Sequence, residues 1–274
     1  MDVNKVRVCV LRIEGTNCEE ESYHAFQRLG ANTEIVHLNE FARKKKKLSD
    51  YHALVLPGGF SAGDYIRAGV IFAARMKSTL GKELEEFITD HKPIIGICNG
   101  FQILVEAGIL PGLSAVITDE PEAVLTTNDS DHFECRPTWL RKEAKSRCIF
   151  TRELEDDKVI MIPSAHAEGK FVLPAEREQQ LLEELKKNGQ VVFRYVSPEG
   201  KSEPGYPFNP NGAIYDIAGI CNRTGNVLGM MPHPERVFFR HTHNDWTRDP
   251  GSASEYGDGK GIFKSALNHV VESF

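Results

Sequence analysis

The stretch PIIGICNGFQIL, residues 93–104, decides the fold. Its apolar first part predicts a buried strand that ends at Ile97, and the part from Asn99 to about Ala107 predicts a helix that ends at Gly108. Cys98 lies in the turn between them. In a sheet of parallel strands such a turn lies at the carboxyl edge, which is where ligands bind.

The first 110 residues repeat this alternation of strand and helix. Strands are predicted over about 6–11, 33–38 and 52–56, and helices over about 18–29 and 70–91, the latter with a candidate break at Gly81. Near-continuous apolar strands separated by helices are typical of a parallel sheet covered on both faces. We therefore expect an open, mainly parallel α/β sheet with helices on both faces.

The second half of the chain contains more strands than helices. Helices are predicted only over about 176–188 and 261–272, whereas short strands are predicted over 123–127, 132–136, 159–162, 191–196, 213–220 and 226–231. We expect these strands to extend the same sheet in an antiparallel manner or to form a small additional sheet. Segments rich in Gly, Pro and Ser predict loops over 196–211 and 241–259. We treat residues 1–274 as a single domain.

The charge balance excludes some classes of function. The chain has 33 Lys and Arg against 39 Asp and Glu, a formal net charge of -6, and so lacks the basic excess that non-specific nucleic-acid binding requires. The uncharged stretch 93–105 is too short to span a bilayer, and the first residues contain no apolar run of the kind found in signal peptides. We expect a cytoplasmic protein that binds neither nucleic acid nor membranes.

A basic run, Arg43 to Lys47, is the main exception to the mixed charge pattern. We interpret it as a solvated loop or helix face, and contact with an acidic partner surface or a nucleotide phosphate is the alternative. The cysteines show no comparable clustering. None of the six is part of a Cys-x-x-Cys pair, so no metal site is expected, and most of them are expected to be reduced, buried and inert.

Cys98 is the cysteine whose surroundings differ from the rest. A nucleophile between a strand and a helix, with small residues on either side, is typical of the nucleophile elbow, and Gly96 and Gly100 remove the side chains that would clash in so tight a turn. The start of the helix favours a thiolate, and its N–H groups can face a developing oxyanion. The alternative is a buried structural cysteine after a core strand.

A cysteine nucleophile needs a base, usually a histidine oriented by a third group. Three His-x-Glu arrangements offer one: His132 with Glu134, His166 with Glu168, and His233 with Glu235. His132 lies inside a predicted strand and ranks lowest, whereas the other two follow strand ends. Pro234 restricts the backbone of His233, which favours His233 over His166.

A glycine pair supplies the third element of the predicted site. Gly58 and Gly59 follow the predicted strand 52–56, and their small size lets backbone N–H groups approach a ligand. The carboxyl ends of neighbouring parallel strands share one edge, so Gly59 and Cys98 are expected to converge there. A glycine-rich turn without a ligand is the alternative, and no Gly-Lys-Ser/Thr follows to make a phosphate-binding loop.

Motifs along most of the chain resemble those of class I, triad-type glutamine amidotransferases, which have a flavodoxin-like fold. The first three are PGGFSAGD (57–64), GICNGFQ (96–102) and MMPHPER (230–236). Further motifs resemble the family of glutaminase subunits of phosphoribosylformylglycinamidine synthase: GDYIRAG (63–69), HAEG (166–169), NPNG (209–212) and IAGICN (217–222). The segments 197–208 and 240–259 look longer than in short members of that family.

This resemblance implies a role for each site residue. It makes Cys98 the nucleophile, His233 the general base and acid, and Glu235 the residue that orients His233. Gly58, Gly59, Asn99 and Gln102 are expected in the substrate site. The backbone N–H groups of Gly59 and Asn99 would form the oxyanion hole, and Gln102 would lie near the bound glutamine. Arg67, His166 and Glu168 are expected at the pocket or at a subunit contact.

The resemblance also implies the reaction and its partners. Glutamine is hydrolysed to glutamate and ammonia through a cysteine thioester, and the ammonia serves the conversion of formylglycinamide ribonucleotide to formylglycinamidine ribonucleotide in de novo purine biosynthesis. This chain is expected to need no cofactor. ATP and magnesium are expected in a large synthetase subunit, and a small accessory subunit is expected to complete the complex.

Other functions remain open at this stage. The chain could serve a different pathway as an amidotransferase subunit, be a thiol hydrolase on the same fold, or be a subunit that only binds a partner. The motif NGFQ (99–102) favours recognition of glutamine. The presence of Cys98, His233 and Glu235 together favours catalysis over binding alone.

Overall fold

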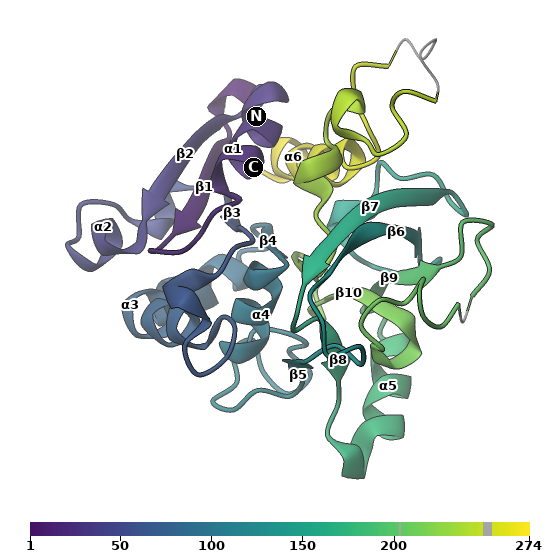
Figure 1. The fold of residues 1–274 in the computed structure, drawn as a ribbon. Coiled ribbons are helices and arrows are strands. Elements are labelled where there is room, and N and C mark those ends of the chain that lie inside the picture. The colour runs from purple at the N-terminus through teal and green to yellow at the C-terminus, as the bar shows by residue number, and fades with distance from the viewer. Residues whose placement is uncertain (203, 249–253) are drawn as a thin grey trace.

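The computed structural model describes residues 1–202, 204–248 and 254–274. It is built around a nine-stranded sheet with the strand order β2-β1-β3-β4-β11-β10-β9-β6-β7 (Figure 1). The first five strands in this order form a parallel half and the last four an antiparallel half. The expected α/β fold, with antiparallel strands added by the second half of the chain, is confirmed.

The parallel half places the elements that the sequence pattern predicts for the start of the chain. Its strands, in spatial order, are β2 (Asn32–His37), β1 (Arg7–Arg12), β3 (Ala53–Leu56), β4 (Ile94–Ile97) and β11 (Val227–Met230). Every residue of β3, β4 and β11 is buried, because helices cover both faces of the sheet. The order of the first four strands is that of flavodoxin-like folds.

The antiparallel half is made by β10 (Ile217–Cys221), β9 (Val191–Val196), β6 (Glu134–Lys142) and β7 (Val159–His166). Two shorter strands, β5 (Val124–Thr126) and β8 (Lys170–Val172), pair with each other in a separate small sheet. Both arrangements expected for the second half therefore occur together.

Two pairs of helices pack on the parallel half. Helix α1 (Glu19–Arg28) contacts α6 (Lys260–Ser273), while α3 (Val70–Thr89) contacts α4 (Asn99–Glu106), and in Figure 1 the two pairs lie on opposite sides of the strands. The short α2 (Leu38–Ala42) packs beside α3, and α5 (Glu178–Lys187) belongs to the antiparallel half. Buried apolar side chains of both halves form one contiguous core.

Two strands are longer than predicted, because the prediction ended each of them at a proline through which the strand in fact continues. The predicted strands 132–136 and 159–162 each end just before a proline, but β6 and β7 continue through Pro137 and Pro163. Pro137 and Pro163 lie directly opposite each other in the pair of β6 and β7. The N–H that each proline lacks is therefore not missing opposite any other residue of the pair. The predicted start of β10 was also wrong, since residues 214–216 form a 3₁₀ turn with positive φ at Tyr215.

The remaining differences in secondary structure also have local causes. Helix α3 is unbroken at Gly81, where an added Cβ would meet no other atom within 4 Å, and one glycine costs a helix only about 1 kcal/mol relative to alanine. The elements α2 and β8 were missed because they are too short to show a hydrophobic period.

The basic run and the long loops lie on the surface. Arg43, Lys44, Lys45 and Lys47 are exposed after α2, and Lys45 and Lys46 pair with Glu40 and Glu34 on the same surface, in keeping with a solvated face. Of the predicted loops 196–211 and 241–259, residue 203 and residues 249–253 lie outside the described part of the chain. Among the described helices, none has the length and apolar character needed to cross a bilayer.

Candidate active site

Cys98 occupies the sharp turn between β4 and α4. Its backbone angles, φ 52° and ψ -105°, lie outside the regions that residues with side chains normally adopt. The turn closes only because its neighbours are small: a Cβ on Gly100 would lie 1.9 Å from Leu56 O, and one on Gly96 would lie 2.4 Å from Gly100 O. The predicted strand–nucleophile–helix geometry is therefore present.

The thiol of Cys98 is buried and faces β7. It is 6 % exposed, and its Sγ lies 3.5 Å from the carbonyl oxygen of Ala165 near the end of that strand. Cys98 begins α4, whose first N–H groups have no partner within the helix. The N–H of Asn99 is one of these groups, so the turn presents a donor beside the sulfur.

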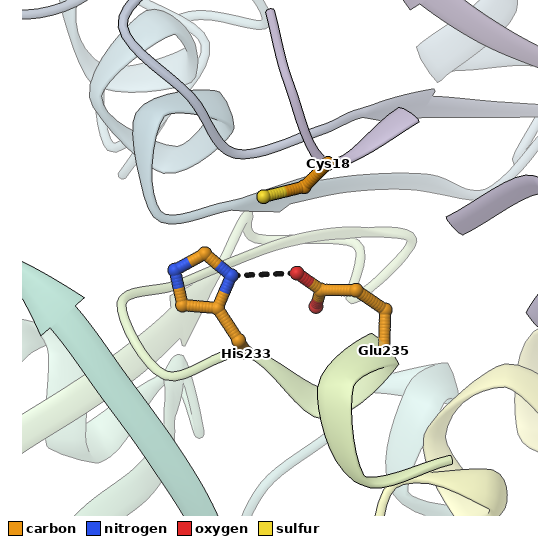
Figure 2. A group of neighbouring side chains, drawn as sticks. All are labelled: Cys18, His233 and Glu235. Carbon is orange, nitrogen blue, oxygen red and sulfur yellow. Dashed lines mark hydrogen bonds and ion pairs between the residues drawn. The ribbon is translucent and has the colours of Figure 1, made fainter. Parts of the chain in front are cut away.

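His233 and Glu235 follow β11 at the same edge of the sheet. The imidazole Nδ1 lies 2.6 Å from Glu235 Oε1, and both side chains are fully buried (Figure 2). Pro234 begins a 3₁₀ turn, Pro234–Val237, which directly follows His233 and contains Glu235. The backbone N–H of His233 also donates to Pro163 O on β7 at 2.8 Å, so the histidine is held on two sides.

Electrostatics favour the protonated form of His233. Burial acts against an imidazolium, but the carboxylate of Glu235, the charge of Cys98 and a hydrogen bond with Cys18 outweigh it and raise the pKa of His233 well above its usual value. Nε2 of His233 is buried and has no hydrogen-bond partner among the described residues. That nitrogen is therefore available for proton transfer in the cavity that Cys98 shares.

A cavity of about 170 Å³ brings Cys98 and His233 together. This is smaller than the pockets of about 300–1,000 Å³ that hold drug-sized ligands. Its lining combines Cys98, His233 and residues of the segments 57–64 and 96–102: Asn17, Gly59, Phe60, Asp64, Ala68, Cys98, Gln102, Phe133, Cys135, Ala165, His166, Ala167, Glu168, His233 and Arg236.

The glycine pair Gly58 and Gly59 lies against His233 and the cavity. A Cβ on Gly58 would lie 2.7 Å from Cε1 of His233, so the glycine is what allows the imidazole to lie so close to this loop. Gly59 lines the cavity and pairs with Thr16 in an isolated bridge. Asn99 ties the loop to α4, since its Oδ1 accepts the N–H of Ser61 at 3.3 Å.

Gln102 and Glu168 connect the cavity to the HAEG segment. Gln102 Nε2 donates to Glu168 O at 2.6 Å, and its Oε1 accepts from Asn99 Nδ2 at 3.0 Å. The carboxylate of Glu168 accepts the N–H of Ala68 at 3.1 Å. Arg67 differs from these residues, because it is exposed, pairs with Glu106 and does not line the cavity.

The two histidines ranked below His233 have different positions. His166, at the end of β7, lines the cavity with 3 % exposure, and burial together with the neighbouring His233 lowers its pKa to about 3. A histidine that remains neutral cannot hold a proton in the way that His233 does. His132 is exposed and lies outside the cavity, but it precedes β6 instead of lying inside a strand, so the reason given for its low rank was wrong.

Sequence reasoning missed Cys18 and Arg236 as site residues. Figure 2 shows the thiol of Cys18 directed over the pair of His233 and Glu235, and Arg236 Nη2 lies 3.2 Å from its Sγ. Ligand atoms of Cys18, His233 and Glu235 lie within 4.8 Å of one another. However, Nδ1 of the histidine is already bonded to the carboxylate, and the guanidinium adds positive charge. These contacts support the imidazole and do not favour a metal ion.

Asp64 was also missed, although it belongs to a motif that the sequence analysis quoted. It lines the cavity, its Oδ1 is buried and has no hydrogen-bond partner among the described residues, and burial together with Glu168 raises its pKa to about 6. An aspartate in a glycine-rich loop resembles an ordinary turn residue, so no sequence signal separated it from its neighbours.

Comparison with known proteins gives a consistent family. The model of the CobB/CobQ-like glutamine amidotransferase domain matches residues 5–270. The phosphoribosylformylglycinamidine synthase subunit PurQ of Archaeoglobus fulgidus is 51% identical, over 98% of this chain and 99% of the relative. The subunit of the same name from Treponema denticola is 45% identical, over 97% of this chain and 100% of the relative.

A solved structure agrees with these relatives. A chain of the structure of PurLQS from Thermotoga maritima is similar with a TM-score of 0.71 and 34% identity, covering 97% of this chain and 99% of that one. The similarity spans the parallel half, the antiparallel half and the site between them. The chain therefore belongs to the PurQ family of phosphoribosylformylglycinamidine synthase subunits, within the CobB/CobQ-like glutamine amidotransferases.

Proposed function

We propose that Cys98, His233 and Glu235 form the catalytic triad with which this chain, as the glutaminase subunit of phosphoribosylformylglycinamidine synthase, releases ammonia from glutamine. Family membership makes the chain an enzyme of the glutamine amidotransferase class. One observation carries the assignment of the residues. A single small cavity holds a cysteine on a strained turn and a buried histidine that Glu235 orients.

The geometry supports a two-step reaction. The thiolate of Cys98 attacks the carboxamide carbon of glutamine, and the N–H groups of Gly59 and Asn99 stabilise the oxyanion that forms. His233 gives its proton to the departing nitrogen, so ammonia leaves and a γ-glutamyl thioester remains. His233 then takes a proton from a water molecule, which attacks the thioester to give glutamate and restore the thiolate.

Glu235 and Cys18 support the histidine through these steps. The carboxylate fixes Nδ1 as the protonated nitrogen, which leaves Nε2 to face the cavity. The thiol of Cys18 lies over this pair, and the guanidinium of Arg236 donates to its sulfur at 3.2 Å. We assign both as positioning residues, because neither sulfur nor guanidinium is required in a bond-making step.

The product of this chain is ammonia, so a partner must use it. The relatives are named as subunits of a synthase, and the similar solved structure is titled PurLQS. We assign to this chain a synthetase subunit as partner, with ATP and magnesium bound there and a small accessory subunit completing the complex. The amination of formylglycinamide ribonucleotide then takes place in the synthetase subunit. Location in the cytoplasm stays a prediction from the sequence.

Ammonia release from glutamine, measured with and without the synthetase subunit, tests this function. The wild-type chain should release little ammonia alone and more when assembled, because an uncoupled glutaminase would waste glutamine. Cys98→Ala should lose activity by about four to six orders of magnitude in both states. Equal turnover with and without the synthetase would contradict coupling, and ammonia release by Cys98→Ala would contradict the nucleophile.

Labelling with a glutamine-mimicking electrophile provides the control. Cys135 is exposed and lines the same cavity, so it is the matched competitor for Cys98. Peptide mapping should find the label on Cys98 in the wild type and in Cys135→Ser, and no label in Cys98→Ala. A label that moves to Cys135, or that never forms, would favour a subunit that only binds its partner.

A further inference from the structure

His166 has an imidazole nitrogen that the reaction above does not use. Its ring is 3 % exposed and lines the cavity beside Cys98 and His233. Nε2 is buried and has no hydrogen-bond partner among the described residues. A buried polar atom without a partner is costly, which indicates that something else occupies the position opposite it when the site is filled.

Asn128 determines which nitrogen of His166 carries the proton. One end of its amide faces two carbonyl oxygens, those of His132 at 2.9 Å and His166 at 2.8 Å, and only an NH₂ group can donate to both. The other end accepts the N–H of Gly169 at 3.0 Å and must therefore be the oxygen. That oxygen lies 3.2 Å from Nδ1 of His166, so Nδ1 must be an N–H donor.

The other ring nitrogen of His166, Nε2, is consequently a hydrogen-bond acceptor that carries no proton. With Nδ1 protonated, Nε2 of the neutral ring has only its lone pair, and burial with His233 nearby lowers the pKa of His166 to about 3. The ring is also held in place by its hydrogen bond to Asn128 and by burial, and it packs so closely on Gly169 that a Cβ there would lie 2.5 Å from its Cε1. The cavity thus has a rigid hydrogen-bond acceptor that neither gives nor takes a proton near neutral pH.

The ends of β4 and β7 give the cavity two chemically different sides. The N–H groups of Gly59 and Asn99 are donors suited to the oxygen of a carboxamide. From β7 the same cavity receives acceptors, namely Nε2 of His166 and the carbonyl oxygen of Ala165 at 3.5 Å from Cys98 Sγ. A carboxamide matches both sides, because it has one oxygen that accepts and one nitrogen that donates.

We propose that His166 selects glutamine over glutamate by accepting a hydrogen bond from the carboxamide nitrogen through its unprotonated Nε2. This inference rests on the proposed glutaminase function. In glutamate an oxygen with lone pairs replaces that nitrogen, so it faces the lone pair of Nε2 without a proton between them. The same contact that holds the substrate therefore disfavours the acid product and promotes its release.

Removing the acceptor should change the two affinities in opposite directions. In the complex with the synthetase subunit, His166→Ala should raise the KM for glutamine and tighten competitive inhibition by glutamate. One hydrogen bond to a buried partner changes affinity by about tenfold, so the ratio of the glutamate inhibition constant to the glutamine KM should fall by at least that factor. His166→Gln, which can present an amide oxygen, should recover part of the ratio.

A merely structural role would give a different pattern. If His166 only filled space, its replacement would weaken glutamine and glutamate in parallel, and an unchanged ratio would overturn the inference. If the wild-type complex released no ammonia from glutamine, the proposed function itself would fail. If the wild-type complex releases ammonia and the ratio is unchanged in His166→Ala, only the proposed role of His166 is contradicted.

A measurement on the unmodified chain tests the premise independently of any variant. Nitrogen NMR of the wild-type protein, with the imidazole signals assigned by correlating each ring with its own backbone, should show Nδ1 of His166 protonated and Nε2 unprotonated throughout pH 5–8. A protonated Nε2 in that range would overturn the inference even if both variants failed to fold.

Discussion

Cys98 at the end of β4 and Ala165 on β7 are in contact, with 3.5 Å between Sγ and the carbonyl oxygen. In the sheet order, β11, β10, β9 and β6 all lie between those two strands. The antiparallel half must therefore curl back over the carboxyl edge of the parallel half, as the arch of β6 and β7 in Figure 1 shows. This curvature places β7 over the sheet edge, so that residues of both halves line one cavity.

Replacing Glu235 by glutamine should lower kcat by about 10⁴-fold while the cavity stays intact. The amide cannot stabilise an imidazolium and no longer fixes Nδ1 as the protonated nitrogen. The measurement is ammonia release by the assembled complex, with electrophile labelling of Cys98 as the check that the site is formed. A kcat within tenfold of wild type would show that Glu235 does not orient His233.

The pKa of His233 should fall when its neighbours are removed. Glu235, Cys98 and Cys18 each oppose the effect of burial, so Cys98→Ser and Cys18→Ala should both lower the pKa of His233 in an NMR titration. His24 on the surface of α1 serves as an internal reference. An unchanged His233 titration in Cys98→Ser would mean that the two groups do not interact.

The same raised pKa has a consequence for stability. A histidine whose folded pKa exceeds its unfolded value stabilises the fold below about pH 6.5, its unfolded pKa, and this contribution is lost as the pH rises through the folded value. Between about pH 6.5 and the pKa of His233 in the folded protein, the free energy of unfolding of the wild type should therefore decrease relative to that of His233→Ala. Denaturant unfolding of both proteins across the interval measures the difference, and parallel curves would contradict the prediction.

Gly58→Ala should reduce kcat with little change in the fold. The added Cβ would lie 2.7 Å from Cε1 of His233 and 3.3 Å from Sγ of Cys18, so the imidazole must move away from its position. A displacement of about 1 Å at a catalytic group can cost about a hundredfold in rate. Ammonia release at saturating glutamine measures this loss.

Gly81→Ala is the matched control for that substitution. Its Cβ meets open space on α3, so activity should be unchanged and the free energy of unfolding should rise by about 1 kcal/mol. Equal activity of the two variants would show that the close approach at Gly58 has no bearing on catalysis.

Asp64 should make glutamine binding depend on pH. Burial and Glu168 raise its pKa to about 6, so the carboxyl group ionises as the pH rises from 5 to 7 and gives the cavity a negative charge that can attract the α-ammonium of glutamine. The KM for glutamine should therefore fall with rising pH through about 6. The measurement is KM against pH for the wild type and Asp64→Asn.

The asparagine variant should lack this dependence because its side chain cannot ionise. Asp157→Asn is the control, since Asp157 is exposed and does not line the cavity, and it should behave like the wild type. The same KM profile in the wild type and in Asp64→Asn would exclude Asp64 as its source.

Much of the fold and the principal site residues could be predicted from local sequence. The apolar runs around Val8, Val55 and Ile95 gave the parallel strands, because strands buried on two faces need continuous apolar residues. The elbow at Cys98 could be recognised because its flanking glycines are a steric requirement of the turn itself. The predicted strands 132–136 and 159–162 ended too early, at Pro137 and Pro163. The effect of a proline on a strand depends on the residue opposite it, which the sequence alone does not show.

The sequence by itself determined the order of the elements, the strained turn at Cys98 and the His-Pro-Glu segment after β11, all of which depend on interactions between near neighbours in the chain. Only the tertiary structure decided which groups meet in the cavity. Cys18 behind His233, the unpaired Asp64 and the fixed tautomer of His166 each depend on contacts between distant segments. Such contacts depend on how distant segments pack together in the folded protein, which the spacing of residues along the chain does not determine.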